Sequence, residues 1–154
     1  MAPEAEPTRR PGKTPARDDF VFFHPMRVRW AECDVQGVVF YPQYFVYFDV
    51  AMTEYMRELG FTGPVMTEFL TVHAEADYRG SARFDDEIEI GVRCSRLGRS
   101  SMTLDFAIFR DREILTEGSN TYVHVDLEAH ASAPHPEELV GTILAFEKVA
   151  PERP

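Results

Sequence analysis

Residues 42–60 read PQYFVYFDVAMTEYMRELG and form the most strongly patterned stretch of the chain. Steps of three and four residues separate a first set of apolar side chains, which are Phe45, Phe48, Met52, Tyr55 and Leu59. A second set on a neighbouring face comprises Tyr44, Tyr47 and Ala51. A helix with two apolar faces must be mostly buried. Pro42 suits a first helical turn and Gly60 suits a left-handed cap, so we predict a buried helix over Pro42–Leu59.

Beyond this helix the apolar residues alternate with polar ones, which is the period of half-buried β-strands. The alternating runs span residues 71–78, 87–94, 102–108 and 113–127, and a shorter run precedes the helix at 26–30. Gly98 and Asp111 mark short connections between the later runs. In the last run Val123, Val125 and Leu127 share one face. The pattern predicts an antiparallel meander of four half-buried strands, preceded by one strand over Met26–Trp30.

The two ends of the chain differ in composition from its centre. Residues 1–19 hold four prolines and mixed charges, and we expect them to form a flexible tail. A last helix should begin near Pro136, because two glutamates follow it and favour a first helical turn. Pro151–Pro154 is expected to fray. The predicted globular domain therefore covers residues 20–150.

The order of one strand, one buried helix and four strands predicts an α+β fold. A single central helix can be buried only if a curved antiparallel sheet wraps around it. Such a layer leaves one face and one edge of the sheet uncovered, so we expect a homodimer or homotetramer.

Charge and composition exclude several classes of protein. The formal net charge is −10, which argues against nucleic-acid binding because no basic footprint is available to neutralise phosphates. Long apolar runs are lacking, so no membrane span is expected. The two cysteines, Cys33 and Cys94, lie far apart without metal or redox spacing. We therefore expect a reducing, cytoplasmic location and no metal site.

The densest cluster of unusual residues is Glu32–Pro42, which reads ECDVQGVVFYP and leads directly into the predicted helix. The first turn of a helix presents unpaired N–H groups and the positive end of its dipole, which can polarise a carbonyl. Gly37 would let the loop bring Asp34 back towards those amides. A carboxylate beside such donors is a plausible hydrolytic site. The alternative is that Asp34 simply caps the helix or the loop.

The stretch from Arg29 to Tyr44 (RWAECDVQGVVFYPQY), continuing through Phe48 and Asp49, resembles the signature of the 4-hydroxybenzoyl-CoA thioesterase family. The turn at Arg83–Asp86 also resembles the family's aromatic–Asp–Asp turn. The resemblance extends from about Val28 to Leu127. It implies a hotdog fold and hydrolysis of an acyl-CoA thioester to a free acid and coenzyme A. Coenzyme A would enter as part of the substrate, and no separate cofactor is implied.

The resemblance also implies roles for two positions in the loop. The aspartate at position 34 would attack the thioester or activate water, and residue type alone does not choose between these routes. The backbone amide of Tyr41 would polarise the thioester carbonyl. A thioester needs less assistance than an amide, because its thiolate leaving group has a pKa near that of free cysteine.

Substrate-binding candidates fall into two groups. Near the predicted helix start they are Gly37, Phe40, Tyr44 and Asp49, and the aromatic members could line an acyl pocket or belong to the core. At the Gly98 turn they are Arg96, Arg99 and Ser100, where basic side chains suit the phosphates of coenzyme A. The alternative for these arginines is a solvated hairpin.

Two rival functions remain open at this point. A hotdog dehydratase or hydratase would need a His–Asp or His–Glu pair, and no such motif is evident. A non-catalytic acyl-CoA-binding protein would need only the pocket. The related Tol–Pal-associated thioesterases carry His where Tyr41 stands, so the short-chain specificity of that branch is not expected here.

Overall fold

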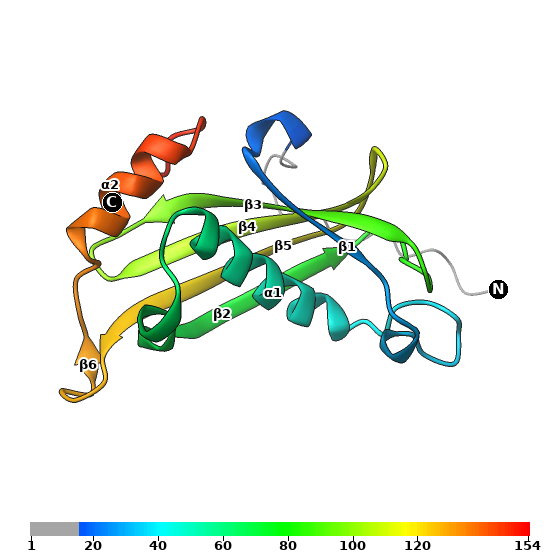
Figure 1. Ribbon diagram of the computed structural model, residues 1–154, viewed down its shortest axis with the longest axis horizontal. Helices are drawn as coiled ribbons and strands as arrows, with labels where there is room; N and C mark the ends of the chain where they lie inside the picture. The colour runs from blue at the N-terminus through cyan, green and yellow to red at the C-terminus, as the bar shows by residue number, and fades with distance from the viewer. Residues whose placement is uncertain (1–15) are drawn as a thin grey trace.

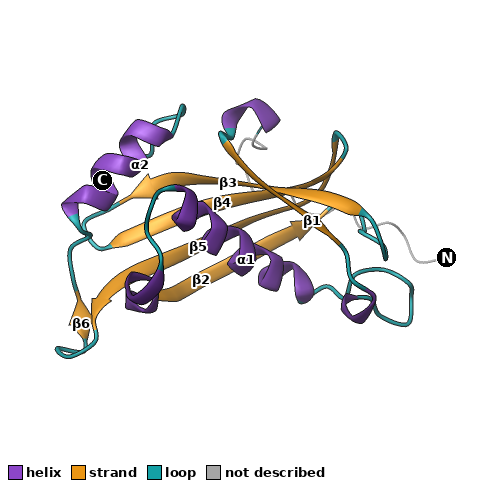
Figure 2. Ribbon diagram, in the orientation of Figure 1, coloured by secondary structure: helices purple, strands orange, loops and turns teal. Residues whose placement is uncertain are grey.

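A curved antiparallel sheet packs around one long helix in the computed structural model, which describes residues 16–154 (Figure 1, Figure 2). The strands are β1 (Phe22–Arg27), β2 (Phe69–Tyr78), β3 (Glu87–Leu97), β4 (Ser101–Arg110), β5 (Glu113–Asp126) and β6 (Ala131–Ser132). The helices are α1 (Gln43–Glu58) and α2 (Glu137–Phe146), with 3-10 turns η1 (Arg17–Asp19), η2 (Trp30–Glu32) and η3 (Gly63–Glu68). The predicted α+β architecture and the predicted buried helix are confirmed.

Helix α1 is buried along most of its length against the sheet. Its fully enclosed side chains include Tyr47, Phe48 and Tyr55. The Phe48 ring stacks on that of Phe106 from β4, with centroids 4.6 Å apart. A Cβ atom at Gly118 of β5 would lie 2.3 Å from the Phe48 ring, so only glycine lets the helix approach the sheet this closely.

The strand order corrects the predicted meander. Strands run β1-β3-β4-β5-β2, so β3, β4 and β5 form a meander while β2 pairs with β5 on its far side. Most of β2 is exposed, including Val72, Ala74 and Tyr78, which we expected on a buried face. The prediction was wrong because alternation shows that a strand has two different faces but does not show which neighbour covers one of them.

Strand β5 also differs from its predicted pattern. Its face towards the helix carries Asn120 and Tyr122, both nearly inaccessible, whereas Val125 is only half-buried and Leu127 is exposed. The Asn120 side-chain amide donates to the Tyr122 hydroxyl at 3.1 Å, which compensates part of the desolvation of both groups. The valine side chains are more apolar, but the hydrogen bond between Asn120 and Tyr122 lets these two polar residues face the core.

The strand expected at Met26–Trp30 lies earlier in the chain, at β1. After Arg27 the backbone leaves the sheet, and the Val28 N–H donates to the carbonyl of Asp86 at 2.9 Å. Residues Trp30–Glu32 then form the turn η2, because the Glu32 carboxylate accepts the N–H of Arg29 at 2.8 Å. The Glu32 carboxylate thus takes the Arg29 N–H, which can no longer continue the pairing of β1 with β3.

Both ends of the described chain pack on the sheet. The expected tail, residues 1–19, lies mostly outside the described residues, but Arg17 at its end stacks over the Phe23 ring at 4.3 Å. At the other terminus Glu152 pairs with the free end of β3, accepting from the Leu97 N–H at 2.9 Å. The expectation that residues 151–154 fray was therefore wrong, since β1 is too short to cover that stretch of β3.

We predict that the chain forms a dimer or tetramer, because β2 is the last strand on its side among the described residues and carries exposed Leu70 and Val72. Sedimentation should give a molecular mass two or four times the 17.6 kDa of one chain. Val72→Lys should shift the protein towards monomer. Leu127→Lys, at a comparably exposed apolar residue beyond β5, should not. A wild-type monomer at micromolar concentration would contradict the prediction.

Candidate active site

A tight loop between η2 and α1 carries the predicted catalytic residue. Its two arms pair with each other through an antiparallel bridge between Cys33 and Val39. Gly37 turns the chain with a φ of +78°, a conformation that glycine adopts without strain. A second bridge joins Val38 to Arg83, so the loop is also tied to the turn before β3. Backbone pairing therefore fixes this loop both to itself and to the turn before β3.

Asp34 is half-buried at the turn of this loop. Its Oδ1 accepts the Gln36 N–H at 2.8 Å, and its carbonyl accepts the Gly37 N–H at 3.0 Å. Among residues 16–154, no protein group donates to its other carboxylate oxygen, Oδ2. The expected capping contacts of an aspartate are present, but they use only one of the two oxygens and leave the second for another molecule.

The backbone at the start of α1 presents an unused donor. The Phe40 N–H donates to the Glu32 carbonyl at 2.9 Å, and the Gln43 N–H donates to the Phe40 carbonyl at 2.8 Å. Between them the Tyr41 N–H reaches no protein acceptor within the described part of the chain. The Tyr41 carbonyl is held by the Tyr78 hydroxyl at 2.9 Å. The Phe40 carbonyl and the Tyr41 N–H belong to one peptide unit, so the bond from the Gln43 N–H holds that peptide while its own donor stays available.

Glu32 links this loop to the helix from inside the core. The residue is 5% exposed, and its Oε2 accepts the Tyr47 hydroxyl at 2.6 Å. The Arg29 guanidinium donates to Oε1 at 2.7 Å. Burial would raise the pKa of Glu32, but these hydrogen bonds and the charge of Arg29 outweigh burial and lower it. Glu32 is therefore a buried carboxylate held in its ionised form.

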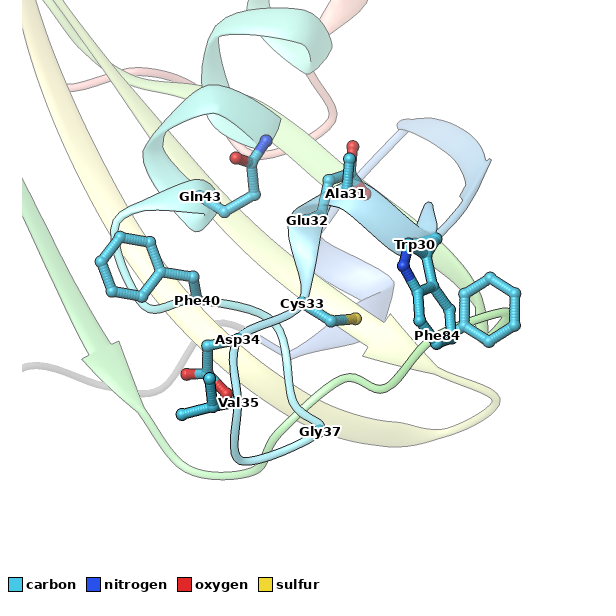
Figure 3. Close-up of a pocket in the computed structure, with 10 residues that line it drawn as sticks. All are labelled: Trp30, Ala31, Glu32, Cys33, Asp34, Val35, Gly37, Phe40, Gln43 and Phe84. Carbon is cyan, nitrogen blue, oxygen red and sulfur yellow. The ribbon is translucent and has the colours of Figure 1, made fainter.

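An open cleft of 640 Å³ lies beside the loop. Its lining residues are Trp30, Ala31, Glu32, Cys33, Asp34, Val35, Gly37, Phe40, Gln43 and Phe84 (Figure 3). Trp30 and Phe84 form one wall, with their rings edge to face at 5.2 Å, and Phe40 lies on the other side of Asp34. The cleft combines two carboxylates, Asp34 and the internally bonded Glu32, with largely aromatic and aliphatic walls.

Cys33 also lines the cleft, and its chemistry is unfavourable for nucleophilic attack. Burial and the nearby carboxylates of Glu32 and Asp34 raise the pKa of its thiol. A thiol is a weak nucleophile until it is deprotonated. Cys33 and Cys94 are both free. A raised thiol pKa therefore argues against Cys33 as a nucleophile at neutral pH.

Two of the substrate-binding candidates near the helix start lie outside the cleft. Tyr44 is 2% exposed, and its hydroxyl accepts the Ala82 N–H at 3.0 Å within the core. Asp49 lies on the exposed side of α1, where partial burial of its carboxyl raises its pKa. Gly37 and Phe40, by contrast, line the cleft together with Asp34.

The arginine turn lies at the opposite end of the sheet from the Asp34 loop (Figure 1). Strand β3 begins at Glu87, next to the turn that walls the cleft, and ends at Leu97, just before Arg99 and Ser100. Eleven residues at about 3.3 Å each separate the two regions by roughly 30 Å. One chain alone does not bring Arg96 and Arg99 to Asp34.

Sequence reasoning missed three residues of this site, which are Glu32, Trp30 and Phe84. A signal for Glu32 was present, because Tyr47 lies on the buried face of the predicted helix and a buried hydroxyl requires a partner. Trp30 and Phe84 are far apart in sequence, and only their tertiary contact makes them one wall. Among residues 16–154, no cluster of three or more His, Cys, Asp or Glu could hold a metal ion. None of the helices described in that range has the length and apolarity to cross a bilayer.

Comparison with known proteins agrees with this geometry. Residues 36–117, more than half of the chain, match the model of the thioesterase superfamily. A protein of Aquifex aeolicus that carries the name esterase is 30% identical over 104 residues, which are 65% of this chain and 80% of that protein. The acyl-CoA thioesterase YbgC of Haemophilus influenzae is 27% identical over 77% of this chain and 90% of its own length.

The fold agrees as well. A Thermus thermophilus thioesterase solved with coenzyme A and zinc superposes with a TM-score of 0.76 at 26% identity, covering 84% of this chain and 96% of that one. The curved sheet, the central helix and the family match lead to one conclusion. The chain belongs to the thioesterase superfamily and is a hotdog-fold thioester hydrolase.

Proposed function

We propose that the protein hydrolyses an acyl-CoA to a free acid and coenzyme A, with Asp34 as the catalytic carboxylate. The observation that carries this proposal is the pairing of a half-buried carboxylate, with one oxygen unused, and the unpartnered Tyr41 N–H on the same short loop. The Haemophilus relative is named as an acyl-CoA thioesterase, and the Thermus relative was solved with coenzyme A. These two relatives supply the substrate class.

In this mechanism the thioester carbonyl accepts a hydrogen bond from the Tyr41 N–H. Asp34 takes a proton from water while the water oxygen bonds to the carbonyl carbon, and the developing oxyanion is stabilised by that N–H. Cleavage of the C–S bond releases coenzyme A as a thiolate, which recovers the proton. In the nucleophilic alternative Asp34 Oδ2 attacks the acyl carbon, the C–S bond breaks to release coenzyme A as a thiolate, and water then hydrolyses the resulting anhydride to the free acid and the Asp34 carboxylate, giving the thiolate its proton.

The acyl group of the substrate is proposed to lie in the cleft against Trp30, Phe40 and Phe84. Aromatic walls suit an apolar acyl group, and stacking with a planar ring adds about 0.5–1.5 kcal/mol to the burial of its area. Aromatic acyl groups such as 4-hydroxybenzoyl are therefore the first to test. Asp49 and Tyr44 would influence this pocket from α1 and the core without lining it in a single chain.

The nucleotide end of coenzyme A is proposed to contact Arg96, Arg99 and Ser100 of another copy of the chain. These residues and Asp34 lie at opposite ends of β3, so a shared site is the arrangement in which both groups could serve one substrate molecule. The exposed edge at β2 supports association. Salt should weaken the contact, because Arg96 and Arg99 are exposed.

Asp34→Asn should lower kcat by about 100-fold or more while the protein stays folded, because asparagine keeps the bond to the Gln36 N–H but cannot accept a proton. The measurement is coenzyme A release from a panel of acyl-CoA thioesters. Asp126→Asn is a matched control, since Asp126 makes the same type of bond to the Glu128 N–H and lies outside the cleft. Turnover within tenfold of wild type, a loss of only ~1.4 kcal/mol, would rule out Asp34 as the catalytic group.

Replacing Arg96 and Arg99 together with Ala should raise KM for acyl-CoA about tenfold or more, because charge-assisted contacts to phosphates are lost. An acyl-pantetheine substrate, which lacks the nucleotide, should barely respond. Arg57→Ala, at an exposed arginine of α1, serves as the control. Equal losses on both substrates, or no loss on either, would show that the nucleotide is bound elsewhere.

Two inactive or impaired variants should complement each other if the site is shared between chains. We expect mixed assemblies of Asp34→Asn chains and Arg96→Ala/Arg99→Ala chains to regain turnover at low acyl-CoA concentration. Some sites in the mixture then combine an intact Asp34 with intact arginines. Activity no greater than the sum of the two separate variants, in verified mixed assemblies, would place both groups on one chain.

A further inference from the structure

We propose that Glu32 is a positioning residue, whose buried carboxylate clamps the Asp34 loop to helix α1 and so holds the carboxylate and the Tyr41 amide in register. This inference rests on the proposed function for its effect on catalysis. The clamp itself is a property of the fold, and it can be tested without an active enzyme.

The first support is where the contacts of Glu32 lead. Its side chain reaches Tyr47, which lies in the first part of α1 and is fully buried. Its own carbonyl accepts the N–H of Phe40, the residue before Tyr41, at 2.9 Å. Glu32 therefore joins the arm of the loop that bears Asp34, two positions on, both to the helix and to Phe40, the residue directly before the unused Tyr41 donor.

The second support is that protein groups already engage both oxygens of the Glu32 carboxylate. Oε2 accepts from the Tyr47 hydroxyl at 2.6 Å and the Arg29 N–H at 2.8 Å. Oε1 accepts from Nε of the Arg29 guanidinium at 2.7 Å and forms an ion pair with Nη2 at the same distance. Three hydrogen bonds and the ion pair engage both oxygens, which leaves Glu32 poorly placed to act as a base although it lines the cleft. Its influence on the reaction must pass through the groups that it holds.

The third support is the charge of the clamp. Because hydrogen bonds lower the pKa of Glu32 on folding, its stabilising contribution is present above the ordinary carboxyl pKa of about 4.5 and is lost as the pH falls through the lowered value. The facing groups are the Arg29 guanidinium and the Tyr47 hydroxyl, whose own pKa is raised by burial and by the carboxylate. The clamp is therefore fully formed at neutral pH.

The variants Glu32→Gln and Tyr47→Phe test the clamp. We expect kcat to fall by about 10- to 100-fold in Glu32→Gln, and less in Tyr47→Phe, because displacements of order 1 Å in a catalytic constellation have effects of this size. KM for acyl-CoA should change little. The double variant should resemble Glu32→Gln, since both substitutions act through the same hydrogen bond.

The chain provides a matched control at the other end of the same helix. The Tyr55 hydroxyl donates to the buried Glu147 carboxylate, also at 2.6 Å. Tyr55→Phe therefore removes an equivalent tyrosine–glutamate bond far from the cleft, and Glu147→Gln takes away the charge of its acceptor. They should lower thermal stability by an amount similar to that of the clamp variants and leave kcat unchanged in the folded protein.

Hydrogen exchange gives a readout that does not depend on activity. Amides of residues 33–41 should exchange faster in Glu32→Gln and Tyr47→Phe than in wild type, but not in Tyr55→Phe. Fluorescence of Trp30, the single tryptophan, reports on the same segment. Unchanged exchange in the clamp variants would overturn the inference, as would faster exchange with an unchanged kcat. An inactive wild type would instead count against the proposed function, while exchange would still decide whether Glu32 holds the loop.

Discussion

The burial of α1 against the sheet is the interaction on which the rest of the structure depends. Phe48 stacks on Phe106 at 4.6 Å, and Gly118 leaves the space for that approach. Truncating a buried phenylalanine in such a position typically destabilises a protein by 3–5 kcal/mol, a large share of total stability. Because this packing fixes the helix against the sheet, the first turn of α1 has a defined place relative to β3 and β5. The loop that precedes it, tied as well to Arg83 and Tyr78, can then present a carboxylate and a peptide N–H.

Apolar packing fixes the depth of the helix but permits small shifts along and around its axis, and polar anchors restrict these. Tyr47 and Tyr55 are both fully buried, and each donates to a buried glutamate at 2.6 Å. A buried hydroxyl without an acceptor would cost about 1–3 kcal/mol, so each bond strongly favours one position of its end of the helix. The anchor at Tyr55 joins α1 to the segment after α2, and the anchor at Tyr47 joins it to the Asp34 loop. The same chemistry thus serves stability at one end and the geometry of the site at the other.

Much of this fold follows from local patterns in the sequence. The helix over Gln43–Glu58 and strands β3 and β4 agree with their predicted periods, because apolar spacing reports which side of an element faces the core. The position of β2 at the edge was not predictable, since a partner strand 40 or more residues away leaves no mark on local alternation. In the site, Asp34, Gly37 and Phe40 share a cleft because they share one loop. Trp30 and Phe84 join that cleft only through tertiary contact, and the arginine turn is separated from it by the length of β3.

A thioester places modest demands on a catalyst, because its leaving group is a stable thiolate. In the proposed mechanism one carboxylate and one peptide donor suffice. The fold must therefore place these two groups accurately, and it does not need to supply many others. That division explains why the residues around Asp34 are of two kinds. Gly37, Glu32 and Tyr47 determine the path of the backbone and do not need to meet the substrate. Trp30 and Phe84 have exposed rings that line the open cleft, so in the proposed mechanism they can determine which acyl group fits while the reactive geometry stays the same.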